Sequence, residues 1–144
     1  MSVSEKLAQM KNEKAAANLE AGLQYLATNK ERNEVVETES GLQYEVLTMG
    51  TGAKPSASND VTCHYHGTVI DGSIFDSSVQ RGVPASFPLN MVIKGWTEGL
   101  QLMPTGSKFR FFIPPHLGYG ERQVSAVIGA NSTLIFDVEL ISFK

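Results

Sequence analysis

The chain changes its hydrophobic periodicity near residue 40. Residues 4–30 consist mainly of Ala, Glu, Lys, Leu and Gln, all of which favour helices. Ser2 followed by Glu5 matches a capping box, so the pattern predicts one helix that begins here. Its large apolar residues are few: Leu7, Met10, Leu19, Leu23 and Leu26. Because so polar a helix cannot be a core element along its whole length, we expect it either to dock through its C-terminal turns or to bind a partner.

From Gly41 onward, apolar and polar positions alternate, which is typical of strands with one buried face. The alternation is clearest in four segments: 42–46, 61–65, 109–113 and 134–140. Residues 91–102 are compatible with a short helix, although Gly95 and Gly99 weaken it. The pattern predicts an α+β fold, in which an antiparallel β-sheet of about five strands wraps around a short α-helix and follows an N-terminal helix.

The same change of periodicity divides the chain into two parts. We expect residues 1–36 to form an N-terminal helical extension and linker, with Val35–Ser40 leading into the strands, and residues 37–144 to form one globular domain. A chain of 144 residues with 42% hydrophobic and 19% charged residues suits this organisation.

Composition narrows the classes of function. The net charge is −3 and the basic residues are scattered, which disfavours nucleic acid and anionic membranes as partners. Cys63 is the only cysteine, so no internal disulfide can form. No apolar run reaches the roughly 18 residues that span a bilayer. We therefore expect a soluble cytoplasmic protein, or a periplasmic one if the sequence lacks its signal peptide.

Three common kinds of catalytic or metal site are disfavoured. His64 and His66 share one face of a strand, but no third ligand lies nearby in the sequence, so no metal site is expected. His116 has no Ser or Cys nucleophile in a recognisable elbow. Residues 105–108 (TGSK) lack the residue order of a phosphate-binding loop.

The aromatic residues with polar tips point to a pocket. Tyr65, Trp96 and Tyr119 carry hydroxyl or indole groups, and Asp76 directly follows an aromatic residue. Buried groups of these kinds need partners, and a core shaped only for stability would use Leu, Ile and Phe instead. Phe109 and Phe111 fit such an ordinary core. The sequence therefore predicts an apolar, aromatic-walled pocket with very few polar groups.

Several long motifs resemble one family. They are YHGTVIDGSIFDSS (65–78), VIKGWTEGLQLM (92–103), IPPHLGYGER (113–122) and STLIFDVEL (132–140). From about Gly41 to the C-terminus, the chain resembles the FK506-binding family (FKBP) of peptidyl-prolyl cis-trans isomerases. The N-terminal helix and SGLQY (40–44) are similar to the bacterial branch that includes the macrophage infectivity potentiator proteins, in which helical N-terminal segments mediate dimerisation.

The resemblance implies roles for individual residues. Trp96 would form the floor of the pocket, Asp76 the acid at its rim, and Tyr119 a hydroxyl donor to a substrate carbonyl, with the Ile93 amide as a second donor. Arg81 would support Asp76 and Tyr65. The catalytic residues implied are Asp76, Tyr119 and Tyr65. The substrate-binding residues implied are Phe75, Arg81, Phe87, Val92, Ile93, Trp96, Val127, Ile128 and Phe136.

The implied activity is isomerisation of X–Pro bonds in polypeptides, which assists folding and needs no covalent intermediate, metal or cofactor. Macrolides of the FK506 or rapamycin type would inhibit it. Two alternatives remain open: a peptide-binding chaperone without turnover, and a homodimer that clamps clients through the N-terminal helix. Because that helix has few large apolar residues, the sequence favours a monomer.

The chain departs from the family pattern in two places. Ala85 follows Pro84 where the family often has an aromatic residue. The segment 121–130 reads Ile128-Gly129-Ala130 where Ile-Pro-Pro is frequent. Val127 and Ile128 are still expected to cover the pocket, so the departures bear on substrate preference and drug affinity more than on the basic activity.

Overall fold

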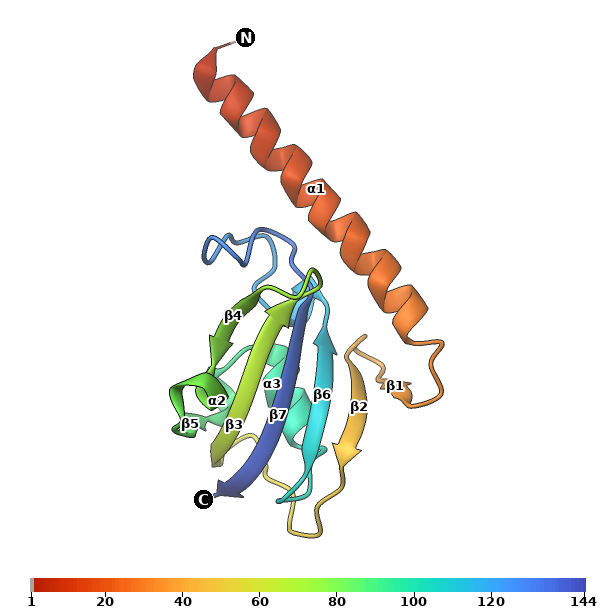
Figure 1. Cartoon of the computed structure of the whole chain (residues 1–144), viewed down its shortest axis with the longest axis vertical. Coiled ribbons are helices and arrows are strands. Elements are labelled where there is room, and N and C mark those ends of the chain that lie inside the picture. The colour runs from red at the N-terminus through yellow and green to blue at the C-terminus, as the bar shows by residue number, and fades with distance from the viewer. Residues whose placement is uncertain (1) are drawn as a thin grey trace.

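The computed structural model describes residues 2–144, in which a long helix precedes one sheet (Figure 1). The helix, α1, spans Val3–Asn29. The Ser2 hydroxyl accepts a hydrogen bond from the Glu5 amide over 3.1 Å, so the predicted N-terminal cap is confirmed. Helix α1 and the sheet are joined through a short turn that leads into β1.

Seven antiparallel strands form the sheet, in the order β1-β2-β6-β7-β3-β4, and β5 also pairs with β3. Strand β3 is long enough to pair with β5 along its first half and with β4 along its second half. The strands are β1 (Val35–Glu37), β2 (Gln43–Thr48), β3 (Asp60–Val69), β4 (Ile74–Ser77), β5 (Ala85–Pro88), β6 (Lys108–Ile113) and β7 (Leu134–Phe143).

The α+β prediction is confirmed, but the sheet has seven strands where the sequence predicts about five. The three strands outside the four clearly alternating segments are short: β1 has three residues, and β4 and β5 have four each. So few residues cannot display a period of two, which explains why alternation does not reveal them. Strand β1 also occupies part of the segment predicted as a linker.

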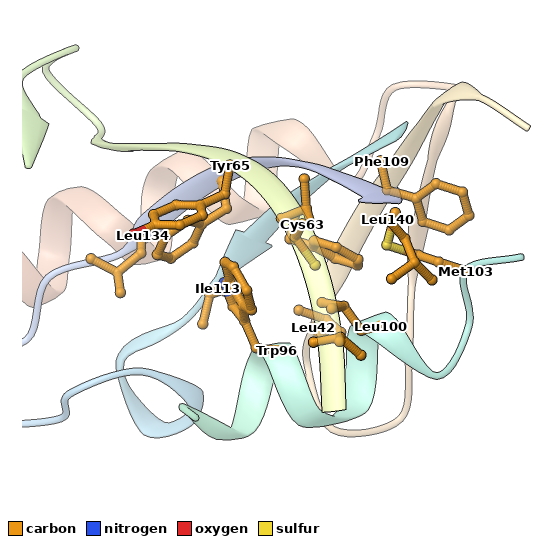
Figure 2. Close-up of a cluster of buried hydrophobic side chains, with 14 of the residues drawn as sticks. Leu42, Cys63, Tyr65, Trp96, Leu100, Met103, Phe109, Ile113, Leu134 and Leu140 are labelled. Atoms are coloured by element: carbon orange, nitrogen blue, oxygen red, sulfur yellow. The ribbon is translucent and has the colours of Figure 1, made fainter. Parts of the chain in front are cut away.

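The main core lies between the sheet and a short helix, α3 (Lys94–Leu100). Figure 2 shows Trp96 and Leu100 of this helix beneath side chains from the strands, among them Cys63, Ile113 and Leu134. Phe109, Phe111 and Ile113 of β6 are buried here, as their alternation predicts. The remaining elements are α2 (Ser78–Arg81) and two 3-10 turns, Leu89–Met91 and Pro115–Leu117.

The C-terminal turns of α1 cover part of the other face of the sheet. Leu26 packs with Val35 and Phe112. Phe112 lies between Phe111 and Ile113, whose side chains point into the main core on the opposite face. Two buried amides fix the helix at this place. The Asn29 side chain donates to Gln43 Oε1 over 2.8 Å, and Gln43 Nε2 donates to the Leu26 carbonyl over 3.0 Å. Residues 2–14 of the chain are all exposed, so α1 docks only through its second half.

Candidate functional site

A cavity of about 900 Å³ opens beside α3, between β3, β4, β5, β7 and the loops after β6. Its size is in the range of sites that bind small molecules or peptide segments. The lining residues are Tyr65, Phe75, Asp76, Phe87, Met91, Val92, Ile93, Lys94, Trp96, Pro115, His116, Gly118, Tyr119, Gly120, Arg122, Val124, Ser125, Ile128 and Phe136.

Trp96 lies at the centre of this lining and is 4% exposed. Three aromatic rings stand edge-on to its indole, with centroids 5.4 Å away for Tyr65, 5.6 Å for Phe87 and 5.3 Å for Phe136. Phe75 in turn stands edge-on to Phe136 at 5.2 Å. Such edge-to-face contacts fix each ring against its neighbour, so the indole face is held as a rigid surface of the cavity.

Tyr65, Asp76 and Arg81 form a hydrogen-bonded group on one wall. The Tyr65 hydroxyl donates to Asp76 Oδ2 over 2.6 Å and accepts from Arg81 Nη2 over 2.9 Å. Arg81 Nη1 donates to the other carboxylate oxygen of Asp76, and the guanidinium carbon lies 5.6 Å from the centroid of the Tyr65 ring. Strand β4 brings Asp76 beside β3, and helix α2 returns Arg81 to the same place.

The charges of this group follow from those contacts. Burial alone would raise the pKa of the Asp76 carboxyl, but hydrogen bonds from Tyr65 and Arg81 and the guanidinium charge hold it below its ordinary value. Burial raises the pKa of the Tyr65 phenol, and the hydrogen bond to the Asp76 carboxylate adds to that effect. At neutral pH the site therefore presents a carboxylate, a protonated phenol and a guanidinium in one network.

Ile93 and Tyr119 also line the cavity. Ile93 is the N-cap residue of α3, and its carbonyl accepts hydrogen bonds from the amides of Trp96 and Thr97 over 3.0 and 3.1 Å. Tyr119 follows the 3-10 turn Pro115–Leu117, and the Arg122 guanidinium carbon lies 5.8 Å from the centroid of its ring. A backbone segment at a helix start and a phenol thus flank the indole surface.

The structure brings together ten of the twelve residues that the sequence singles out. Arg81 is outside the cavity lining and acts through its bonds to Asp76 and Tyr65. Val127 departs from the expectation, because it lines a second groove, against α1, and is not among the residues that line this cavity. The Val124 amide donates to the Ile128 carbonyl over 2.9 Å, and this tight turn directs Ile128 inward while its neighbour Val127 faces α1.

Sequence reasoning misses several lining residues, among them Met91, Lys94, His116 and Val124. Met91 is 78% exposed, so no burial pattern marks it. The His116 ring is held beside the cavity because its Nε2 pairs with the Ser40 carbonyl at 2.7 Å. Its position after two prolines, two residues before Gly118-Tyr119, is the signal that could have placed it beside the pocket.

The part of the chain that the structure describes, residues 2–144, holds no group of three His, Cys, Asp or Glu side chains arranged to bind a metal ion. His64 and His66 instead pair with the hydroxyls of Ser78 and Ser77 at 3.0 and 2.9 Å. None of the helices within the same residues combines the length and the apolar character needed to cross a membrane.

Comparison with known proteins gives two matching family models. Residues 51–141 match the model described as FKBP-type peptidyl-prolyl cis-trans isomerase. Residues 1–46 match the model of the domain amino terminal to FKBP-type peptidyl-prolyl isomerase. The two models together cover nearly all of the chain, with their border near the start of the sheet.

Individual proteins give the same result. FkpA of Aeromonas hydrophila, an FKBP-type peptidyl-prolyl cis-trans isomerase, is 58% identical over 130 residues, which are 90% of this chain and 48% of that protein. The outer membrane protein MIP of Legionella longbeachae is 50% identical over 133 residues, 92% of this chain and 57% of that protein. The crystal structure of FkpA from Escherichia coli superimposes with a TM-score of 0.93 at 42% identity, covering 99% of this chain and 66% of that one. The chain thus spans about half the length of the curated relatives it matches.

Proposed function

The chain belongs to the family of FKBP-type peptidyl-prolyl cis-trans isomerases, in the branch of FkpA and MIP, and we propose that it accelerates the cis-trans isomerisation of X–Pro bonds in polypeptides. The observation that carries the proposal is the fixed indole face of Trp96, surrounded by three edge-on aromatic rings at the base of a cavity of about 900 Å³. A proline ring is compact and apolar and packs well against such a flat surface.

The reaction that the cavity must catalyse is a rotation. The two forms of an X–Pro bond differ by about 0.5–1 kcal/mol, but a barrier of roughly 18–20 kcal/mol separates them because amide resonance is lost on twisting. Resonance places negative charge on the carbonyl oxygen, which water stabilises. Transfer of the amide into an apolar cavity therefore raises the free energy of the planar form more than that of the twisted form.

Further acceleration requires that the cavity bind the twisted amide more tightly than either planar form. Trp96 holds the proline ring, while the Ile93 amide and the Tyr119 hydroxyl donate to carbonyls on either side of it. Asp76 either interacts with the substrate carbonyl that the rotation displaces, or orients Tyr65 through their hydrogen bond. Phe75, Phe87, Val92, Ile128 and Phe136 complete the apolar walls. Neither a covalent intermediate nor a proton transfer is part of this scheme.

The direct test is catalysis of the cis-to-trans isomerisation of a short Leu-Pro or Phe-Pro peptide, with and without the macrolide FK506. We expect acceleration that the macrolide suppresses, because the two ligands would share the surface of Trp96. A folded sample that binds the peptide without accelerating isomerisation would favour a peptide-binding chaperone instead.

Substitution of Asp76 tests the assigned roles. Asp76→Ala removes the carboxylate while leaving the aromatic rings in place, so we expect kcat/KM to fall about tenfold or more, the equivalent of one interaction with a charged group, with the protein still folded. Asp71→Ala is the matched control, since Asp71 lies in the exposed turn before β4, outside the cavity lining. Equal rates for Asp76→Ala and the unmodified protein would contradict the assignment of Asp76.

We also propose the setting in which the activity is used. All the site residues named here fall within 37–144, which supports this range as the catalytic domain and 1–36 as a helical extension. The relative from L. longbeachae is named an outer membrane protein, and this supports the periplasmic alternative over the cytoplasmic expectation. The proposed partners are proline-containing polypeptides, and the 144-residue chain works as a monomer, with a homodimer through α1 as the alternative.

A further inference from the structure

One wall of the cavity belongs to a long loop before β7. Residues 121–133, which we name the pocket loop, supply four lining residues: Arg122, Val124, Ser125 and Ile128. Residues 121–126 are exposed, so the first half of the loop has little support from the domain. The loop is closed at its base, where the Asn131 amide donates to the Gly120 carbonyl over 2.8 Å. The second half of the loop carries the buried Ile128. Whether this half is ordered therefore determines the position of this wall of the cavity.

The second half of the pocket loop rests on α1, and Figure 1 shows the loop close to the middle of that helix. Asn18 Nδ2 donates to the Ala130 carbonyl over 2.9 Å, and Asn131 Nδ2 donates to the Ala15 carbonyl over 3.3 Å. Ala15, Asn18 and Gly22 are three and four residues apart, so they share one face of the helix. Hydrogen bonds in both directions thus join this face to the loop.

Small residues allow the helix and the loop to approach closely. A Cβ atom at Gly22 would lie 2.3 Å from Thr133 Oγ1, and a Cβ atom at Gly129 would lie 3.0 Å from Asn18 Nδ2. Thr133 is 2% exposed. A side chain at Gly22 would therefore force the helix and the loop apart.

The sequence of the loop makes this support necessary. Ile128 is followed by Gly129-Ala130 where the family frequently has two prolines. Proline fixes its own φ angle, whereas glycine is the most flexible residue. Asn131 adopts a φ of 60°, in the left-handed region that non-glycine residues enter at a cost. Contact with α1 supplies the order that the proline pair would otherwise give.

We propose that α1 positions the pocket loop for substrate binding, with Asn18 and Gly22 as positioning residues that hold Ile128 against the substrate. The inference rests on the proposed function, because it concerns the same proline-containing substrate. A loop released from α1 must be ordered again each time a substrate binds, so KM rises. We expect kcat to stay unchanged when the loop is released, because Trp96, Asp76 and Tyr65 make none of their hydrogen bonds or ring contacts to α1.

The first experiment compares Asn18→Ala with Asn12→Ala, a matched control on the exposed first half of the same helix. Isomerisation of a Phe-Pro peptide is followed at a range of concentrations, and peptide affinity is followed separately by the fluorescence of Trp96. For Asn18→Ala we expect KM and the peptide Kd to rise about fivefold, the equivalent of one hydrogen bond, with kcat within about twofold of the unmodified value. Asn12→Ala should change neither quantity.

The second experiment restores the contact by compensation. Gly22→Ala favours helix formation, yet its methyl group meets Thr133 Oγ1, so KM should rise as for Asn18→Ala. Thr133→Ala removes that oxygen, which has no hydrogen-bond partner among residues 2–144, and leaves Thr133 Cβ 3.3 Å from the added methyl. We expect the double variant Gly22→Ala/Thr133→Ala to recover most of the lost affinity.

Hydrogen exchange distinguishes positioning from general destabilisation. In Asn18→Ala, amide exchange should accelerate within residues 120–133 and stay unchanged in β3 and β6. Unchanged KM and peptide affinity in Asn18→Ala and Gly22→Ala would overturn the inference, as would acceleration of exchange throughout the sheet. If the unmodified protein did not catalyse isomerisation, the proposed function would fail, and peptide affinity together with hydrogen exchange would still decide whether α1 positions the loop.

Discussion

The Asp76 carboxyl group couples the chemistry of the site to stability. Because the folded protein lowers the pKa of Asp76 below its ordinary 3.8, the carboxylate contributes stability that is present above pH 3.8 and is lost as the pH falls through the folded value. The side chain is 43% exposed, so solvent screens the contribution and it stays modest. At neutral pH this stabilising carboxylate is also the group at the rim of the cavity to which we assign a role in catalysis.

The substitution Asp76→Asn should therefore destabilise the protein at pH 7, and this destabilisation should disappear at acidic pH. The difference in unfolding free energy between the two proteins, measured with urea from about pH 7 to about pH 3, should decline only below the ordinary value of 3.8. Carboxyl NMR titration gives the pKa of Asp76 directly. Arg81→Gln should raise it, because the guanidinium is one of the groups that lower it. Titration of Asp76 at or above 3.8 in the unmodified protein would refute the argument.

Six of the ten lining residues that the sequence predicts are aromatic, and three of those six carry a polar group. Tyr65, Asp76 and Trp96 stand out in the sequence because their polar groups require hydrogen-bond partners wherever they are buried. Lys94 and Gly118 belong to the same lining but carry no such signal. Val127 and Ile128 are adjacent and both apolar, and only the geometry of the turn decides which of them faces the cavity. Residue chemistry therefore predicts the aromatic members of the lining better than its other members, whether those are polar or apolar.

At the scale of elements, the hydrophobic pattern predicts the long strands and misses the short ones. Strands β3, β6 and β7 alternate over six to ten residues and are found where they are predicted. The pattern predicts docking of α1 through its C-terminal turns, which the structure shows, but it does not identify most of the residues that make the contact. Leu19 and Leu23 are exposed, and Leu26 is joined instead by small or polar residues such as Asn18 and Gly22. Close approach of two backbones depends on small side chains, which a search for apolar stripes overlooks.

Helix α3 gives a test of the same point, because its two glycines face β6. A Cβ atom at Gly99 would lie 2.6 Å from Cε1 of the buried Phe111 ring. Gly99→Ala should lower the free energy of unfolding by about 1–3 kcal/mol through overpacking, partly offset by about 1 kcal/mol of helix propensity. Urea unfolding measures the net loss. Phe111→Leu, which frees space at this contact, should make the alanine less costly in the double variant. An alanine variant as stable as the unmodified protein would contradict the packing argument.

At the scale of the whole molecule, the first half of α1 has no partner within residues 2–144, while the second half carries the pocket loop. The exposed half presents Val3, Leu7 and Met10, which are 76%, 60% and 56% exposed and lie on one face at intervals of four and three residues. Each aliphatic side chain buries less than the roughly 150 Å² of a small aromatic one, so three from each of two helices fall short of the roughly 1,200 Å² of a stable interface.

We therefore expect the 144-residue chain to sediment as a monomer at micromolar concentration, as its sparse apolar pattern also predicts. Sedimentation velocity at increasing concentration measures this, and Leu7→Lys is the matched variant because it removes the central apolar side chain of the exposed half. Identical sedimentation of the two proteins would agree with a monomer. A dimer that Leu7→Lys dissociates would show that α1 joins two copies. In such a dimer the helix that holds the pocket loop would also hold the partner, so kcat/KM should then depend on protein concentration.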